Sequence, residues 1–250
     1  MEGGRRPRTG RKILKNVNFE TWHCARLNLV TRDEVRARIC GLGIVPAIRV
    51  TSAEDALFAA ESVSRGGIPV VEVTTTVPGA VAVIREIRRA HPDIVVGAGT
   101  VLDAETAECC VAAGVHFLTS RGLHDSVMEV AARNNIAVMP GALTPTEICA
   151  AWKAGADFVK VYPCAPVGGP SYIRSMRAPF PELPFIAAGG VNQQTAAEYI
   201  AAGAAALGIG GDLIPHAAIR ERNRDWINEL SHRFLGIVKT ARSRLAKAAY

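Results

Sequence analysis

The stretch Ile44–Thr74 reads IVPAIRVTSAEDALFAAESVSRGGIPVVEVT and contains the unit that is repeated along the chain. It starts with a short apolar run rich in β-branched residues and continues through an Ala-rich segment with helical periodicity. It ends in a second apolar run. Thr51–Glu54 has the spacing of a capping box, which predicts the start of the helix there. The stretch therefore predicts a strand, a helix and a second strand.

The same alternation continues to residue 215 and predicts eight strands, each followed by a helix. The predicted strands are Ile44–Arg49, Pro69–Thr74, Ile94–Gly97, His116–Thr119, Ala137–Met139, Phe158–Val161, Phe185–Ala187 and Ala206–Gly208. The helices predicted between them include Ala53–Ser64, Ala80–Ala90, Ala104–Ala113, Ser126–Asn134, Pro145–Ala154 and Gln194–Ala202.

Eight strand–helix units, spaced about 20 to 27 residues apart, predict an α/β fold of the (β/α)8 TIM-barrel type. The rival is an open doubly wound sheet. It is disfavoured because its G-x-G-x-x-G turn is missing, and Gly41-Leu42-Gly43 comes before the first strand instead of after it. We expect a short N-terminal helix, Arg32–Leu42, to close the bottom of the barrel and Ala217–Tyr250 to supply the last helices.

Composition and charge limit the partners of this chain. It has 250 residues, 49% of them hydrophobic and 21% charged, and no apolar run long enough to span a membrane. Residues 1–38 account for the whole formal net charge of +6, so the remainder is neutral and is not expected to bind nucleic acid. We interpret residues 1–29 as a basic, disordered extension and residues 30–250 as one barrel domain.

The six cysteines show no CxxC pair and no His at metal-ligand spacing. This usage predicts free thiols in a reducing cytoplasm and no metal site. Cys109 and Cys110 are adjacent, and the others lie in apolar stretches where Cys behaves as a small hydrophobic residue.

Two charged residues interrupt predicted strands whose neighbours are apolar. Lys160 lies in Phe158–Pro163 and Glu72 lies near the end of the second strand. Burial disfavours a charged ammonium, and a neutral amine attacks a carbonyl to form a Schiff base. Glu72 could then exchange a proton with Lys160. An inert buried salt bridge between the two is the structural alternative. Lys153, at a helix end, is explained by the helix dipole and by its access to water.

Chemistry in such a barrel belongs at the carboxyl ends of the strands. Two glycine-rich turns follow the seventh and eighth strands, and they contain Gly189-Gly190 and Gly210-Gly211. Glycines let backbone N–H groups approach an anion closely, so the turns predict a phosphate site. Arg49 at the end of the first strand could hold a carboxylate, and Thr74 and Thr100 offer hydroxyl groups at strand ends. A surface salt bridge would also explain Arg49, and a helix cap would explain Thr100.

From about Thr31 to Ile214 the chain resembles the class I aldolases for 2-keto-3-deoxy-6-phosphogluconate and 4-hydroxy-2-oxoglutarate. The matching stretches are Glu72–Thr74, Val96–Val101, Met139–Gly141, Thr144–Glu147, Lys160–Pro163, Gly168–Ile173 and Gly189–Val191. They are specific together and in this order, whereas none is specific alone.

The resemblance implies a metal-free lyase, without a cofactor, that reversibly splits a 2-keto-4-hydroxy acid into pyruvate and an aldehyde. It implies that Lys160 forms the Schiff base, that Glu72 is the general acid and base, and that Thr100 contacts the pyruvate portion. The glycine turns would hold a distal phosphate, and the assembly would be a homotrimer. Arg49 would anchor the carboxylate, because Thr76 stands where many members have arginine.

Two other positions depart from the resemblance. Arg121 stands where members usually have a small residue or proline, and Asp212 lies close to where some place a serine beside the phosphate. An inward carboxylate would repel a phosphate, whereas a helix-capping one would not. Two alternative functions remain from the residues alone. One is a phosphosugar isomerase or epimerase that forms no covalent adduct, and the other is a non-catalytic barrel that binds a phosphorylated metabolite.

Overall fold

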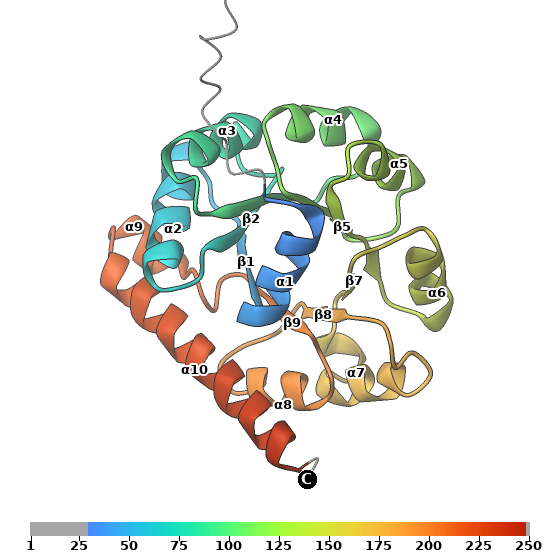
Figure 1. The fold of residues 1–250 in the computed structure, drawn as a ribbon. Helices are drawn as coiled ribbons and strands as arrows, with labels where there is room; N and C mark the ends of the chain where they lie inside the picture. Colours follow the sequence, from blue (N-terminus) through green and yellow to red (C-terminus); the bar gives the residue numbers. More distant parts are fainter. Residues whose placement is uncertain (1–29, 249–250) are drawn as a thin grey trace, which may run out of the picture.

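A parallel barrel forms the centre of the protein, and helices surround it on the outside (Figure 1). The computed structural model describes residues 30–248. The sheet order is β5-β4-β3-β2-β1-β9-β8-β7-β6, and every pairing is parallel. The strands are β1 (Ile44–Ile48), β2 (Val70–Thr74), β3 (Val95–Gly99), β4 (Phe117–Thr119), β5 (Ala137–Met139), β6 (Gly141–Ala142), β7 (Val159–Val161), β8 (Phe185–Ala188) and β9 (Ala206–Ile209).

β5 and β6 are two parts of one strand, interrupted at Pro140, which has no N–H to donate to a ladder. β5 pairs with β4, whereas β6 pairs with β7. Two backbone bonds cross the remaining gap. The N–H of Asp157 donates to the Val138 carbonyl, and that of Lys160 donates to the Pro140 carbonyl, both at 2.9 Å. The sheet therefore closes on itself, and the predicted (β/α)8 TIM barrel is confirmed.

The helices differ from the predicted ones mainly at their ends. They are α1 (Arg32–Leu42), α2 (Ala53–Arg65), α3 (Ala80–Ala90), α4 (Ala104–Ala112), α5 (Asp125–Arg133), α6 (Pro145–Lys153), α7 (Pro170–Arg177), α8 (Ala196–Ala201), α9 (His216–Arg220) and α10 (Arg224–Ala248). A short 3-10 turn, Ala165–Val167, precedes α7.

One local prediction needs correction. The predicted capping box at Thr51–Glu54 does not form, because the cap of α2 is Ser52, whose hydroxyl accepts the Asp55 N–H at 3.1 Å. The helix expected after the sixth predicted strand, for which no bounds were predicted, is α7. Pro170 fits its first turn, where the missing N–H has no partner to lose.

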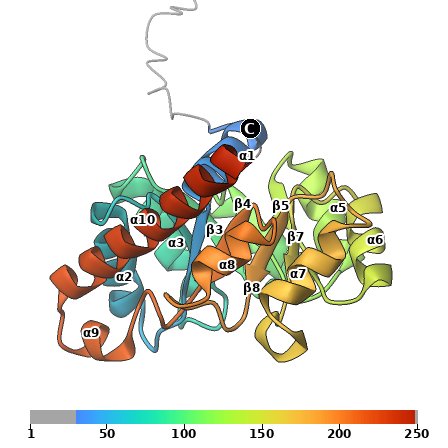
Figure 2. The ribbon, with the colours of Figure 1, turned by 90° about the horizontal axis from the view of Figure 1, so that it is seen from below.

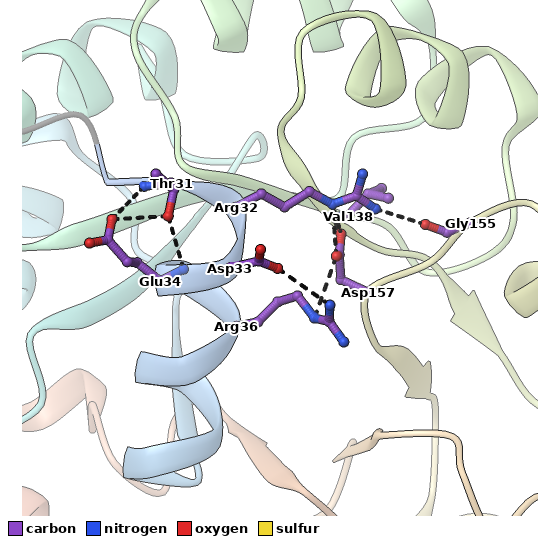
Figure 3. A network of polar contacts seen from close by, with 8 residues as sticks. All are labelled: Thr31, Arg32, Asp33, Glu34, Arg36, Val138, Gly155 and Asp157. Atoms are coloured by element: carbon purple, nitrogen blue, oxygen red, sulfur yellow. Dashed lines mark hydrogen bonds and ion pairs between the residues drawn. The ribbon is translucent and has the colours of Figure 1, made fainter.

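Helix α1 lies across the amino-terminal ends of the strands and closes this end, the bottom of the barrel, as predicted (Figures 1 and 2). Its N-cap Thr31 and Glu34 form a capping box. Asp157 fixes α1 to the barrel, because its carboxylate accepts Arg32 Nε at 2.8 and 3.0 Å and the Val138 N–H at 2.7 Å (Figure 3). At the other end of α1, Arg242 of α10 donates to the Gly41 carbonyl at 2.7 Å.

The core has two layers. The larger lies between the outer faces of the strands and the surrounding helices. The smaller fills the lower interior of the barrel, where α1 contributes Val35 and Ile39 to a cluster with Val70, Phe117 and Phe158 from the strands. The barrel interior is thus packed at the bottom, which leaves its upper end for polar side chains.

Two of the cysteines, Cys110 and Cys164, are fully buried in the larger core layer. Burial raises the pKa of the Cys110 and Cys164 thiols to about 11, so both stay protonated and pack as small apolar groups.

Among residues 30–248, no helix is both long and apolar enough to cross a membrane. The predicted extension, residues 1–29, lies outside the described residues, so that boundary stays a prediction.

Candidate active site

Three polar side chains form the next layer of the barrel interior above the packed cluster. Side chains alternate between the two faces of a strand, so each residue two positions beyond an inward-facing one also faces inward. Glu72 follows Val70 in β2 at this spacing. In the same way Thr119 follows Phe117 in β4 and Lys160 follows Phe158 at β7. The strand periodicity therefore places Glu72, Thr119 and Lys160 in one layer.

The three side chains contact one another in a closed triangle. Lys160 Nζ lies 3.0 Å from Glu72 Oε2 and 3.4 Å from Oε1. It also donates to Thr119 Oγ1 at 3.0 Å, and that hydroxyl donates to Glu72 Oε2 at 3.2 Å. The Glu72 side chain is 4% exposed and that of Lys160 is 12% exposed. The structure thus brings the two predicted residues together, with the amine on the more open side of the pair.

Gly99 in β3 makes room for the Glu72 side chain. A Cβ at residue 99 would overlap Glu72 Oε1, so no side chain fits there. Thr100 follows with φ of 60°, a left-handed conformation that is strained for a β-branched residue. Thr75 holds this segment, because its N–H donates to the Gly99 carbonyl at 2.8 Å and its hydroxyl donates to the Thr100 carbonyl at 2.9 Å.

A cavity of about 200 Å³ opens above Lys160 at the carboxyl ends of β1, β7, β8 and β9. Its lining includes five further residues predicted for the site, namely Arg49, Gly189, Gly190, Gly210 and Gly211, together with Tyr162 and Asp212. Gly189 and Gly190 have φ of 85° and 87°, values that favour glycine. Both glycine-rich turns therefore lie at the same cavity as Lys160.

Arg49 directly follows β1, which ends one residue earlier than predicted, and its side chain is exposed at the cavity. Within residues 30–248 the guanidinium makes no ion pair or hydrogen bond, so the alternative explanation of Arg49, a surface salt bridge, does not apply. A free guanidinium at a cavity suits a ligand carboxylate, which it can bind through two parallel hydrogen bonds.

Two predicted residues lie away from the cavity lining. Thr74 is fully buried, and its hydroxyl donates to the Ile48 carbonyl at 3.0 Å and lies 2.9 Å from the Thr76 hydroxyl. Thr74 thus joins β1 to β2, and it does not line the cavity. Thr100, which directly follows β3, also falls outside the lining. The helix-cap explanation of Thr100 fails, since Asp103 caps α4.

Thr119 is the residue that sequence reasoning missed. A threonine in a β-run is ordinary, so nothing in its identity distinguished it. Its position did carry a signal, because it shares the inward face of its strand with Phe117.

A metal site requires several ligating side chains close together. No cluster of three or more His, Cys, Asp or Glu side chains that could hold a metal ion occurs in the part of the chain that the structure describes.

Known proteins match both the sequence and this fold. The family model described as KDPG and KHG aldolase matches residues 35–230. The chain belongs to this family. Among its relatives, the KHG/KDPG aldolase of Escherichia coli K12 is 32% identical over 189 residues, which cover 75% of this chain and 88% of the relative. The 2-dehydro-3-deoxy-phosphogluconate aldolase of Pseudomonas aeruginosa is 30% identical over 183 residues, or 73% and 82% of the two chains.

Solved structures of this family have a fold similar to that of the present chain. A KDPG aldolase from Legionella pneumophila, with pyruvate captured at low pH as a covalent carbinolamine intermediate, has a TM-score of 0.74 and 30% identity. The match covers 79% of this chain and 96% of that one. An aldolase of Zymomonas mobilis with 3-phosphoglycerate has a TM-score of 0.72 and 27% identity, covering 81% and 95%. The chain is accordingly an aldolase, and hence a lyase, which disfavours both the isomerase and the non-catalytic alternative.

Proposed function

We propose that this aldolase cleaves a 2-keto-4-hydroxy acid reversibly into pyruvate and an aldehyde through a Schiff base on Lys160. The observation that carries the proposal is the 3.0 Å contact between Lys160 Nζ and Glu72 Oε2 at the floor of the cavity. A buried carboxylate beside a partly buried amine can take the proton that the amine must lose before it attacks a carbonyl. The carbinolamine captured in the Legionella relative supports this chemistry for the present chain.

The first half of the reaction builds the imine. Neutral Lys160 Nζ attacks C2 of the keto acid, and the former keto oxygen becomes the hydroxyl of a carbinolamine. Glu72, 3.0 Å from the amine, then gives a proton to this hydroxyl, which leaves as water as the C=N bond forms. Thr119 bonds to both groups and keeps them aligned during these transfers.

The second half breaks the carbon–carbon bond. Glu72 removes the proton of the C4 hydroxyl, the C3–C4 bond breaks, and its electron pair moves into the protonated imine to give an enamine and an aldehyde. The enamine takes a proton at C3, and water then releases pyruvate and the free amine. Arg49 anchors the C1 carboxylate from the cavity wall, and the turns at Gly189-Gly190 and Gly210-Gly211 hold the far end.

Borohydride trapping tests the proposal. Wild-type protein incubated with pyruvate and borohydride should carry a reduced pyruvate adduct, which peptide mapping should locate on Lys160. Lys160→Ala should form no adduct, and its cleavage activity should fall by on the order of 10⁴-fold or more. Lys153→Ala is the matched control, because Lys153 is exposed at the end of α6 and should change neither readout. Equal activity of the two variants would reject the assignment of Lys160.

Three further predictions remain part of this proposal. The working assembly is a homotrimer, the reaction needs no metal, and the enzyme acts in the cytoplasm. The first follows from the resemblance of the sequence to the family, and the third from the use of cysteine as free thiols. Sedimentation of the full chain tests the first, and activity after treatment with a chelator tests the second.

A further inference from the structure

The far wall of the cavity carries a carboxylate whose role the reaction chemistry leaves open. Asp212 lines the cavity together with Gly210 and Gly211, in the turn after β9. The charged groups in the lining are Lys160, Arg49 and Asp212. Asp212 is therefore the one acidic side chain in the described lining.

Asp212 has no structural task within residues 30–248. It makes no ion pair, and its side chain accepts no hydrogen bond, unlike Asp103, which caps α4 by accepting the Thr106 N–H at 2.8 Å. Helix α9 begins only at His216, with Pro215 at its N-cap, so Asp212 does not cap it. The turn itself is closed by the N–H groups of Leu213 and Ile214, which donate to the Gly210 carbonyl.

The charges of the lining balance before any ligand enters. Glu72 offsets Lys160, which leaves Arg49 and Asp212 as one positive and one negative charge. When a keto acid binds, its carboxylate pairs with the Arg49 guanidinium, so Arg49 is no longer available to a second anionic group. A phosphate at the other end of the substrate would then face a carboxylate and no free cation in the lining, and like charges at close range repel.

An uncharged hydroxylated tail fits the same wall better. A hydroxyl group both donates and accepts a hydrogen bond. Asp212 offers an acceptor, while the backbone N–H groups of Gly211 and Asp212 donate to no other group among the described residues and are free to donate to a ligand oxygen. The turn at Gly190 offers another such N–H on the neighbouring wall.

We propose that Asp212 determines specificity for a 2-keto-4-hydroxy acid with an unphosphorylated, hydroxylated tail, by accepting a hydrogen bond from a tail hydroxyl. This inference rests on the function proposed above. It differs from the phosphate site that the glycine turns predict from the sequence, since the charge of residue 212 decides between an anionic and a neutral tail.

The experiment compares two substrates that differ only at the tail. These are 2-keto-3-deoxy-6-phosphogluconate and the same acid without its phosphate. Wild-type enzyme should prefer the unphosphorylated acid in kcat/KM by at least about tenfold. Asp212→Asn keeps the size of the side chain and removes its charge, so the preference should shrink by about tenfold or more, chiefly through KM for the phosphorylated acid.

Asp93→Asn is the matched control, because Asp93 is an exposed residue at the opposite end of the barrel and its replacement changes the net charge equally. It should leave the preference as in the wild type. A wild-type preference for the phosphorylated acid would overturn the inference, as would an unchanged preference in Asp212→Asn. In both cases, trapping of pyruvate on Lys160 in the wild type would show that the proposed function still stands. Failure to trap pyruvate would overturn the proposed function and the inference together.

Discussion

The two ends of the barrel each hold a buried carboxylate paired with a cation, but the two pairs are built differently. At the bottom, the 2% exposed Asp157 side chain binds Arg32 through both oxygens and also accepts the Val138 N–H. At the top, Glu72 meets a single amine and a single hydroxyl. Arginine stays protonated in proteins, whereas lysine can release its proton. The bottom pair can only hold α1 in place, while the top pair can move a proton.

The first test of this difference is Glu72→Gln, which keeps the shape of the Glu72–Lys160 pair but removes the carboxylate that can act as a base. We expect kcat to fall roughly 10²- to 10⁴-fold, because no group then accepts the proton of the amine or of the C4 hydroxyl. Steady-state kinetics and the rate of borohydride trapping measure the effect. The melting temperature is the control, and an unchanged kcat in a folded variant would refute the role of Glu72.

The second change is Asp157→Asn at the bottom pair. It should lower the free energy of unfolding by roughly 2–3 kcal/mol, because a charged hydrogen-bond acceptor is lost beside two arginines. Activity should stay near that of the wild type. Urea unfolding measures the loss. Glu108→Gln is the control, since its pair with Arg133 is exposed and contributes less than about 1 kcal/mol. Equal losses in both variants would contradict the structural role of Asp157.

A third prediction concerns pH and the bottom of the barrel, where His116 is 6% exposed. Burial, and next the charge of Arg88, lower its pKa from 6.5 to about 4. The Val96 N–H donates to its Nδ1 at 3.1 Å, which also requires a neutral ring. The unfolded chain therefore binds more protons between these two values. The contribution of the neutral His116 ring to the free energy of unfolding is fully present above pH 6.5 and is lost as the pH falls towards 4.

Between pH 7 and pH 5 this loss should reach roughly 2 kcal/mol. His116→Asn offers an amide oxygen to the Val96 N–H and cannot titrate in this range, so its unfolding free energy should change less with pH. Urea unfolding of both proteins at the two pH values measures the difference. A variant with the same pH dependence as the wild type would show that another group is responsible.

The smallest effect is expected for Thr119→Val, which removes the hydroxyl between Lys160 and Glu72 but keeps the shape of the side chain. We expect kcat to fall about tenfold, with the pH profile of pyruvate trapping displaced. Thr119→Ser should restore both, since it restores the hydroxyl. A lower melting temperature with an unchanged pH profile would instead indicate a packing role only.

The sequence predicted those parts of the molecule that break a pattern. Lys160 and Glu72 are charged residues within apolar strands, and the structure brings them to 3.0 Å from each other. The eight apolar runs alternating with helical segments predicted the barrel, because a parallel strand buried on both faces reads as a continuous apolar run. Pro140 divides one of these strands into β5 and β6 without changing the path of the chain.

Contacts between side chains of strands far apart in the sequence were not predictable in the same way. Thr119 and Thr74 are both inward-facing threonines at strand ends, yet one bonds to Lys160 and the other to the Ile48 carbonyl. Which of them meets the amine depends on the closed ring and not on local pattern. The bounds of α7 were not predicted, because its first residues follow two glycines and packing of Ile173 in the core stabilises the helix.

The break at Pro140 has a consequence for how activity arises. It opens the hydrogen-bonded ring at one place, between β5 and β7, with Glu72 in β2 on the β5 side of this seam and Lys160 in β7 at its other side. The N–H of residue 160 is itself one of the bonds that seals the ring there. Because Lys160 lies at one side of this seam while Glu72 and Thr119 lie in strands on the other side, closure of the barrel there brings the amine beside the carboxylate, and we expect turnover to depend on that closure.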